Sequence, residues 1–359
     1  MTQAREIKVH KSMKIKIASY QSVMMIRGGP HVKIVETKKH LEELGVEVEL
    51  FNMWEPVEKM MDCDLVYLFG ANIGVYHFAR SLRERDIRFV VNPIFYTRHS
   101  PRTIKTICTI DKFSRRLLRG FWWEYGFTRD ICQWAELVLP NTLAEGNLIS
   151  EGMGILQEKI ELVPNGVSEK FLSGDPKLFE EKYGLKNFIL NVGHIGPDRK
   201  NVLALVKALE GIDRPAVIIG RITPGGEAEA VLARAQKNKN LLIIDGIDYD
   251  DPLLASAYAA CDTFVLPSKF ETPGRAALEA TLAGAQIVIT PFGGTKEYFG
   301  EMAEYVNPYS VNSIRTGIER ALNRHKTSDL RKHVKDNFLW DKIAQKTIGI
   351  FEKLFNKKE

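Results

Sequence analysis

The stretch Thr263-Phe-Val-Leu-Pro-Ser-Lys-Phe-Glu-Thr-Pro-Gly-Arg-Ala-Ala-Leu-Glu-Ala280 contains a short apolar strand, a Pro-Gly turn and a helix-forming run. Glu271 falls in the turn after the strand, and Glu279 falls about two helical turns later. Apolar runs of strand length alternate with helical patterns along most of the chain, which predicts parallel sheets with helices on both faces. The expected fold class is therefore α/β, with doubly wound parallel sheets.

The chain has 359 residues, a length that favours two domains of similar size. A strong turn, Pro164-Asn-Gly-Val167, separates two series of alternating strands and helices, and the polar stretch after it shows no strand pattern. The pattern predicts a polar leader over residues 1–12, an N-terminal domain over 13–167, a linker over 168–186, a C-terminal domain over 187–330 and, over 331–359, a C-terminal helix that packs back toward the N-terminal domain.

Composition excludes several classes of protein. No apolar run reaches the roughly 18 residues of a membrane span, and the N-terminus lacks the apolar core of a signal peptide. The four cysteines have neither metal-ligand nor redox-pair spacing. A net charge of +5 is modest for this size, so no nucleic-acid partner is expected. We expect a cytoplasmic protein.

Three segments follow predicted strands, where open parallel sheets bind ligands and helix N-termini favour phosphate. They contain Gly28 and Gly29, the adjacent cations Arg199 and Lys200, and Gly274 with Arg275. Two cations at a helix start are unfavourable unless an anion joins them, which indicates a diphosphate. Taken alone, the segment with Gly28 and Gly29 is also explained by an ordinary glycine turn, and the two glutamates by helix-terminal charge.

Further segments accompany the two glutamates in a characteristic order. They are Gly28-Gly29, Val163-Pro-Asn-Gly-Val167, Arg199-Lys-Asn201, Asp245-Gly246, Tyr258-Ala-Ala-Cys-Asp262, Leu266-Pro-Ser268, Ala283-Gly-Ala285, Val288-Ile-Thr290 and Phe292-Gly-Gly-Thr-Lys-Glu297. Together, over nearly the whole chain, they resemble the retaining GT-B glycosyltransferases, most closely glycosyltransferase family 4, or group 1.

The resemblance implies two Rossmann-like domains facing a cleft and the transfer of a hexosyl group, with retained configuration, from a nucleoside diphosphate-sugar to a glycan, lipid-linked or small-molecule acceptor. It implies neither a metal nor a cofactor. By the same resemblance, Glu279 binds the donor ribose, Glu271 the transferring sugar, and Lys200 with Arg199 the diphosphate. The remaining donor-binding residues are Gly28, Gly29, His194, Gly274 and Arg275. The chain departs from the family at His194, where arginine is common, and at Thr272-Pro-Gly274, where Gly-Phe-Gly is usual.

Residues 98–119 hold seven basic side chains and one acid. Helical spacing puts Lys112, Arg115, Arg116 and Arg119 on one face and apolar residues on another, which is typical of a helix on an anionic membrane surface. A solvated basic face over an ordinary core contact, or a site for a phosphate-bearing soluble acceptor, explains the pattern too. The candidate acceptor or membrane surface comprises Arg98, Arg102, Lys112, Arg115, Arg116 and Arg119, so the protein could bind peripherally at the inner membrane face.

Two rival functions fit the same fold: a GT-B sugar-nucleotide epimerase, and a non-catalytic protein that binds a nucleotide-sugar or a polyanion. A metal-dependent enzyme fits less well. Asp62-Cys-Asp64 precedes its strand, at the edge opposite to ligand sites, and Asp251 before Pro252 is better explained as a helix N-cap.

Overall fold

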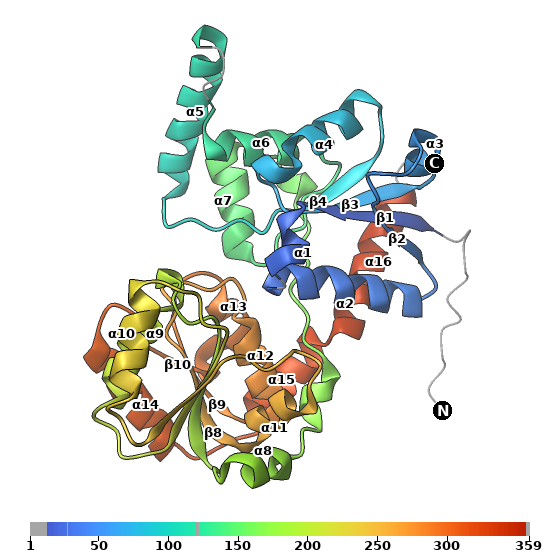
Figure 1. The fold of residues 1–359 in the computed structure, drawn as a ribbon. Helices are drawn as coiled ribbons and strands as arrows, with labels where there is room; N and C mark the ends of the chain where they lie inside the picture. Colours follow the sequence, from blue (N-terminus) through green and yellow to red (C-terminus); the bar gives the residue numbers. More distant parts are fainter. Residues whose placement is uncertain (1–12, 27, 119–121, 357–359) are drawn as a thin grey trace. The chain divides into compact units, whose positions relative to one another are not determined.

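The structure is a computed structural model that describes residues 13–26, 28–118 and 122–356. The predicted leader over residues 1–12 lies outside this part of the chain. Two compact units are present: Met1–Pro164 with Trp340–Glu359, and Asn165–Leu339. Each contains a parallel sheet flanked by helices (Figure 1), so the predicted α/β class with two doubly wound domains is confirmed.

The first unit contains a four-stranded sheet in the order β2-β1-β3-β4, with every pairing parallel. The strands are β1 (Lys14–Ser19), β2 (Glu47–Leu50), β3 (Leu65–Phe69) and β4 (Phe89–Asn92). Its helices are α1 (Ser22–Ile26), α2 (Gly29–Glu43), α3 (Val57–Met61), α4 (Ile73–Glu84), α5 (Pro101–Leu117), α6 (Glu124–Trp134), α7 (Leu143–Met153) and α16 (Trp340–Asn356), with a 3-10 turn η1 (Gln157–Lys159). Residues of β3 are buried on both faces, as expected of a central parallel strand.

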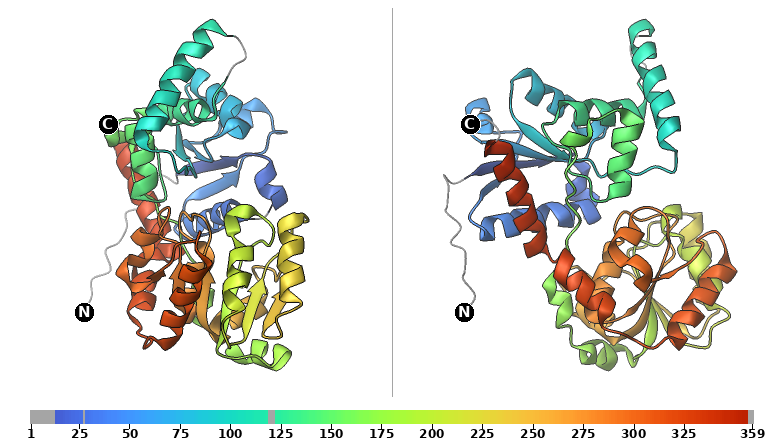
Figure 2. Two further views of the ribbon diagram at one scale, coloured as in Figure 1. Left: turned by 90° about the vertical axis from the view of Figure 1, so that its left-hand side faces the viewer. Right: turned by 180° about the vertical axis from the view of Figure 1, so that it is seen from behind.

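The last helix, α16, belongs to the first unit although it comes last in sequence (Figure 2). Its Phe351 is fully buried and meets Tyr67 of β3 edge to face, with ring centroids 5.6 Å apart. Trp340, at its start, lies near His40 of α2. Burial of these aromatic side chains explains why a segment remote in sequence completes this core.

The second unit contains a six-stranded parallel sheet in the order β10-β9-β8-β5-β6-β7. The strands are β5 (Phe188–Val192), β6 (Ala216–Ile219), β7 (Leu241–Ile244), β8 (Cys261–Leu266), β9 (Gln286–Ile289) and β10 (Glu304–Tyr305). Its helices are α8 (Pro176–Tyr183), α9 (Val202–Leu209), α10 (Gly226–Ala235), α11 (Pro252–Ala260), α12 (Arg275–Ala283), α13 (Thr295–Phe299), α14 (Val311–Asn323) and α15 (Asp329–Phe338), with 3-10 turns η2 (Glu169–Leu172), η3 (Asp198–Lys200) and η4 (Gly300–Met302). Successive residues of β8, Phe264 and Val265, enter cores on opposite faces of the sheet.

The predicted linker over residues 168–186 is not a linker. Its 3-10 turn η2 and helix α8 belong to the second unit, where Phe171 and Phe179 are fully buried. The amide of Phe179 also donates to Ser256 Oγ at 2.8 Å. Two phenylalanines in a polar segment are enough to fix it to a core, so the boundary lies at Pro164 and Asn165. At the other end, residues 331–339 stay with the second unit as part of α15, and only the segment from Trp340 onward joins the first.

Candidate functional site

In the sheet of the second unit, the order in which the chain adds strands reverses between the two central strands. From β5 the chain moves outward through β6 and β7, then returns to β8 on the other side of β5 and moves outward through β9 and β10. The loops after β5 and β8 therefore leave neighbouring strands at the same carboxyl edge and diverge to opposite sides. Such a switch point is where open α/β sheets bind ligands. The loop after β5 carries Arg199 and Lys200, and the loop after β8 carries Glu271.

Glu271 forms ion pairs with both cations of the neighbouring loop. Its Oε1 lies 2.7 Å from Lys200 Nζ and 3.2 Å from Arg199 Nη1, and its side chain is buried. Burial alone would raise the pKa of Glu271, but the charges of Lys200 and Arg199 outweigh it and hold this pKa below its ordinary value. Glu271 is thus an ionised carboxylate, and it is the anion that compensates the two cations that sequence analysis assigned to a diphosphate.

The backbone of Glu271 is fixed by the loop that follows β9. Its amide donates to the Phe292 carbonyl, and its own carbonyl accepts from the Gly294 amide, both at 3.0 Å. Between them, Gly293 has a φ of +97°, and a Cβ at this position would collide with the Glu271 carbonyl oxygen. Only glycine combines this conformation with such close approach. The Phe292-Gly-Gly294 segment therefore holds the carboxylate in place.

Asn201 fixes the loop that follows β5, and sequence analysis did not single it out as a site residue. It adopts a left-handed conformation with φ of 57°, and its Nδ2 donates to the carbonyls of Pro267 at 2.9 Å and Pro308 at 2.7 Å. One side chain thereby joins the ends of three loops. Its sequence signals were its place in the segment Arg199-Lys-Asn201 and the tolerance of asparagine for this backbone region. Lys269 strengthens the connection, because its amide donates to the Arg199 carbonyl at 2.8 Å and its ammonium pairs with Asp198.

Helix α12 begins beside Glu271 in sequence and carries the second glutamate. Gly274 is its N-cap residue with φ of +73°, and no side chain caps the helix. Glu279 is buried, with Oε2 accepting from the Tyr258 hydroxyl at 2.8 Å and Oε1 paired with Arg275 at 3.1 Å. Burial raises the pKa of Glu279 above its ordinary value, the direction opposite to Glu271. A carboxylate has about four acceptor positions, so two contacts leave capacity for ligand hydroxyls.

His194 follows β5 and lies near the same cations. Burial, with the charges of Lys200, Arg221 and Arg199, lowers the pKa of His194. The imidazole is therefore neutral near pH 7, and it supplies one donor and one acceptor where an arginine would supply a charge. The structure thus brings together His194, Arg199, Lys200, Glu271, Gly274, Arg275 and Glu279 in the second unit.

Gly28 and Gly29 lie in the first unit, at the start of α2. Gly28 is the N-cap residue and Pro30 occupies the first turn, as expected for a helix that begins after a strand and a glycine loop. Within its own unit, helix α1 separates this turn from β1, a central strand of the sheet.

The predicted basic face over residues 98–119 is wrong in one respect. Arg115 does not point outward with Lys112: its Nε lies 2.9 Å from the Asp111 carboxylate, its Nη1 pairs with Asp130, and its guanidinium lies 4.1 Å from the centroid of the Trp122 ring. Buried acids attract this arginine inward, which helical spacing alone does not reveal. Arg98, Arg102 and Lys112 are exposed. The side chain of Arg116 and the whole of Arg119 lie outside the described part of the chain.

The candidate metal ligands have other roles. Asp62 pairs with Lys14 at 2.7 Å, and Asp64 accepts from the Lys14 amide at 2.8 Å. Asp251 caps α11 by accepting from the Leu253 amide at 2.9 Å, which confirms its predicted N-cap role. Within residues 13–26, 28–118 and 122–356, no three histidine, cysteine or acidic side chains form a set that could hold a metal ion.

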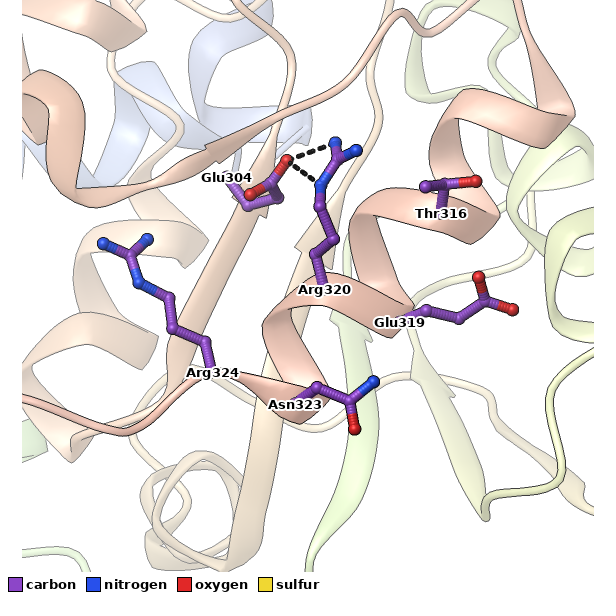
Figure 3. Close-up of a pocket in the computed structure, with 6 residues that line it drawn as sticks. All are labelled: Glu304, Thr316, Glu319, Arg320, Asn323 and Arg324. Carbon is purple, nitrogen blue, oxygen red and sulfur yellow. Dashed lines mark hydrogen bonds and ion pairs between the residues drawn. The ribbon is translucent and has the colours of Figure 1, made fainter.

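A pocket elsewhere in the second unit is separate from this cluster. It lies at edge strand β10 and the last turns of α14, where one oxygen of Glu304 accepts from Arg320 Nε at 2.9 Å (Figure 3). Thr316, Glu319, Asn323 and Arg324 complete its lining. Among the described residues, the lining of this pocket includes no candidate site residue.

Comparison with known proteins identifies the second unit. Residues 177–337 match the family described as glycosyl transferases group 1. The second unit is a group 1 glycosyltransferase domain. This confirms the group 1 family that the sequence resembled, and the matched range contains every candidate donor residue of this unit from His194 to Glu279.

Curated relatives of the group 1 glycosyltransferase domain include mannosyltransferases. The chain is 25% identical over 258 residues to MMP alpha-(1->4)-mannosyltransferase of Mycolicibacterium hassiacum, covering 65% of this chain and 60% of that one. It is 28% identical over 244 residues to the serotype-specific mannosyltransferase WbdA of Escherichia coli, covering 63% and 30%. The chain thus spans less than two thirds of the length of these relatives.

Solved structures confirm the GT-B fold over both units. Sucrose-phosphate synthase from Thermosynechococcus elongatus is similar with a TM-score of 0.74 at 18% identity, covering 96% of this chain and all of that one. Anabaena HepE in complex with UDP and glucose gives a TM-score of 0.69 at 17% identity, covering 95% and 99%. Among the helices of the described residues, none combines the length and apolar composition that a bilayer crossing requires.

Proposed function

We propose that this protein is a retaining hexosyltransferase that uses a nucleoside diphosphate-sugar as donor. The observation that carries the proposal is the pairing of Lys200 and Arg199 with one buried carboxylate, Glu271, at the switch point of the group 1 glycosyltransferase domain. Two cations against one anion leave an excess of positive charge at the edge of the sheet where phosphates bind.

This excess suits the chemistry of glycosyl transfer. As the bond from the anomeric carbon to the diphosphate breaks, negative charge develops on the departing phosphate oxygens, and fixed cations stabilise it. Lys200 and Arg199 supply those cations. The uncapped amides at the start of α12 supply further donors, because the first amides of a helix lack partners within the helix.

The two glutamates are suited to different tasks. Glu271 stays ionised next to Lys200 and accepts hydrogen bonds from hydroxyls of the transferring sugar. Glu279 accepts from the ribose while Tyr258 and Arg275 fix its orientation. Because Lys200 contacts Glu271 directly, the same lysine links recognition of the sugar to stabilisation of the diphosphate.

The relatives indicate which donor sugar to test first, and the family resemblance indicates the classes of acceptor. Several relatives are named as mannosyltransferases, so a nucleoside diphosphate-mannose is the first donor to test. We propose that the first unit binds a glycan, lipid-linked or small-molecule acceptor, and that transfer needs neither metal nor cofactor.

Release of nucleoside diphosphate from a panel of nucleotide-sugars, with and without added acceptor and in the presence of a chelator, tests the proposal. A glycosyltransferase releases diphosphate in proportion to sugar transferred, and Lys200→Ala abolishes both. Release of diphosphate with stoichiometric free sugar in the absence of acceptor indicates an epimerase. Binding without any release, at every donor and acceptor tried, indicates a non-catalytic nucleotide-sugar protein and contradicts the proposal.

A further inference from the structure

Helix α5 projects from the first unit. In both Figure 1 and Figure 2 its C-terminal half extends past the other helices of that unit. Its N-terminal half is anchored, because Ile104 is fully buried and packs closely against Gly152 of α7. A projecting helix with one anchored half exposes the rest of its surface to a binding partner.

An ion-pair network fixes the rotation of α5 about its own axis. Asp111 is fully buried and pairs with Arg115 at 2.9 Å and with Arg129 of α6 at 3.1 Å. Gly126 of α6 permits this approach, since a Cβ there would collide with the Asp111 carboxylate. Breaking a buried ion pair is strongly unfavourable, so the face of α5 that carries Asp111 and Arg115 stays packed in the interior.

The opposite face of α5 is apolar and exposed. Ile110, Phe113 and Leu117, spaced three and four residues apart, form one stripe, and they are 48%, 66% and 68% exposed. Large apolar side chains aligned in this way mark an interaction surface, whereas scattered exposed ones do not. The sequence pattern left two interpretations of this apolar side open, a membrane-facing surface and an ordinary core contact, and the structure leaves it exposed.

Exposed cations line one flank of the apolar stripe. Lys105 and Lys112, seven residues apart, lie along the same side of the helix, and Arg102 lies between them and the stripe. The one acidic residue in α5, Asp111, is neutralised inside the network. Among the described side chains of α5, the exposed charged ones are therefore all cationic, and they lie beside the apolar stripe. Apolar side chains beside cations complement the acyl chains and phosphates of an anionic lipid surface.

We infer that the exposed face of α5 docks the protein on a bilayer that contains anionic lipid, with Phe113 and Leu117 inserted at the level of the acyl chains and with Arg102, Lys105 and Lys112 at the phosphates. The inference goes beyond sugar transfer and does not depend on it, because docking requires neither donor nor acceptor. Its consequence for an enzyme of this kind is proximity to substrates in the membrane plane.

Vesicle sedimentation of the full-length protein tests the inference. Phosphatidylcholine vesicles with and without phosphatidylglycerol are compared at low and high salt. Two variants remove the proposed contacts: Phe113→Ser with Leu117→Ser, and Arg102→Gln with Lys105→Gln and Lys112→Gln. Matched controls in the second unit are Leu178→Ser, and Lys186→Gln with Lys237→Gln and Lys239→Gln, all of them at exposed positions. Thermal unfolding confirms that every variant is folded.

The wild-type protein and both controls are expected to bind the anionic vesicles, less tightly at high salt. The basic variant is expected to bind roughly a hundredfold more weakly, at about fivefold for each cation removed. The affinity of the apolar variant for anionic vesicles is expected to fall on the order of tenfold or more, because two large side chains are no longer buried in the bilayer. Lys200→Ala is expected to bind vesicles normally, which separates this inference from the proposed function.

Three results would overturn the inference. They are absence of sedimentation with anionic vesicles, equal sedimentation with phosphatidylcholine alone, and wild-type binding by both α5 variants. Analytical ultracentrifugation adds a fourth: if wild-type protein self-associates and the apolar variant is monomeric without any change in vesicle binding, the stripe is an interface between copies of the chain.

Discussion

Lys200 and Glu271 are 71 residues apart in sequence, yet Lys200 Nζ donates to Glu271 Oε1 at 2.7 Å. The pair joins the loops that leave β5 and β8, the two strands between which the strand order of the sheet reverses. A buried carboxylate and a partly buried ammonium stabilise each other, and each is placed by a separate set of backbone hydrogen bonds. This relationship makes the two residues one functional unit, and their variants are expected not to be additive.

Lys200→Ala is expected to weaken binding of nucleoside diphosphate by about tenfold or more, since a charge-assisted contact contributes roughly 1.5 to 3 kcal/mol. Calorimetry measures the affinity. Lys237→Ala, at an exposed position in the same unit, is the control for loss of a cation. Equal affinity of the Lys200 variant and the wild type would remove this residue from the donor site.

Variants of the two glutamates are expected to change different kinetic constants. Glu279→Ala raises the donor KM more than it lowers kcat, because ribose contacts exist in the ground state and the transition state alike, whereas Glu271→Ala lowers kcat strongly. Steady-state kinetics with a fixed acceptor measures both constants. Glu279→Gln keeps an acceptor for Tyr258 and separates loss of charge from loss of structure. If both alanine variants behave as wild type, the glutamates are merely helix-terminal charges.

Gly293→Ala is expected to reduce turnover by displacing Glu271, because the added Cβ would collide with the Glu271 carbonyl oxygen. Gly284→Ala is the matched control: its φ of +95° imposes similar backbone strain, and a Cβ there meets no atom within 4 Å. Both variants are expected to lose about 1 kcal/mol or more in the free energy of unfolding through positive φ. A comparable decrease in kcat for both would show that Gly293 does not position the carboxylate.

Asp111→Asn is expected to destabilise the first unit by about 3 to 5 kcal/mol, because it leaves Arg115 and Arg129 with an uncompensated buried charge. Lys112→Asn, at the adjacent exposed position, is expected to change the free energy of unfolding by less than about 0.5 kcal/mol. Urea denaturation measures both. Similar stability of the two variants would mean that the network does not fix α5.

Lys33 of α2 is expected to make the stability of the first unit depend on pH. It is buried, donates to Asn141 Oδ1 and faces Glu145, and burial lowers the pKa of Lys33 to about 7. The unfolded value is about 10.4, so between these values the unfolded chain binds more protons and the free energy of unfolding rises with pH. Below pH 7 the cost of the buried cation is fully present.

Lys33→Met is expected to remove this dependence. Urea denaturation of wild type and variant between pH 6 and 10.5, a window set by the two pKa values, measures it. Wild-type stability is expected to increase toward alkaline pH by more than that of the variant. Parallel profiles would show that Lys33 keeps an ordinary pKa in the folded protein.

Most strands and helices, and their order along the chain, were predictable from local patterns of residues. Alternating apolar runs and helical patterns predicted the parallel sheets, because strands buried on both faces must be apolar throughout. Local signals placed Glu271 in a loop after β8, Glu279 on α12 and Asp251 at a helix N-cap, since these depend on residues only a few positions away. The family of the second unit was indicated by the resemblance that the two glutamates and their accompanying segments carry.

Local patterns could not predict which charged side chains pair, because the partners come from distant segments. The pairing of Lys200 with Glu271, the bridging by Asn201 and the closure of the Glu271 loop on Gly293 join segments tens of residues apart, and the order of strands in the sheet brings them together. The inclusion of residues 168–186 in the second unit depended on a core that Phe171 and Phe179 enter. In α5, helical periodicity identified a basic side and an apolar side but not which of them is buried. The ion pairs of Asp111 with Arg115 and Arg129 bury one side of α5, because paired charges can lie in a protein interior. Phe113 and Leu117 therefore stay exposed on the other side.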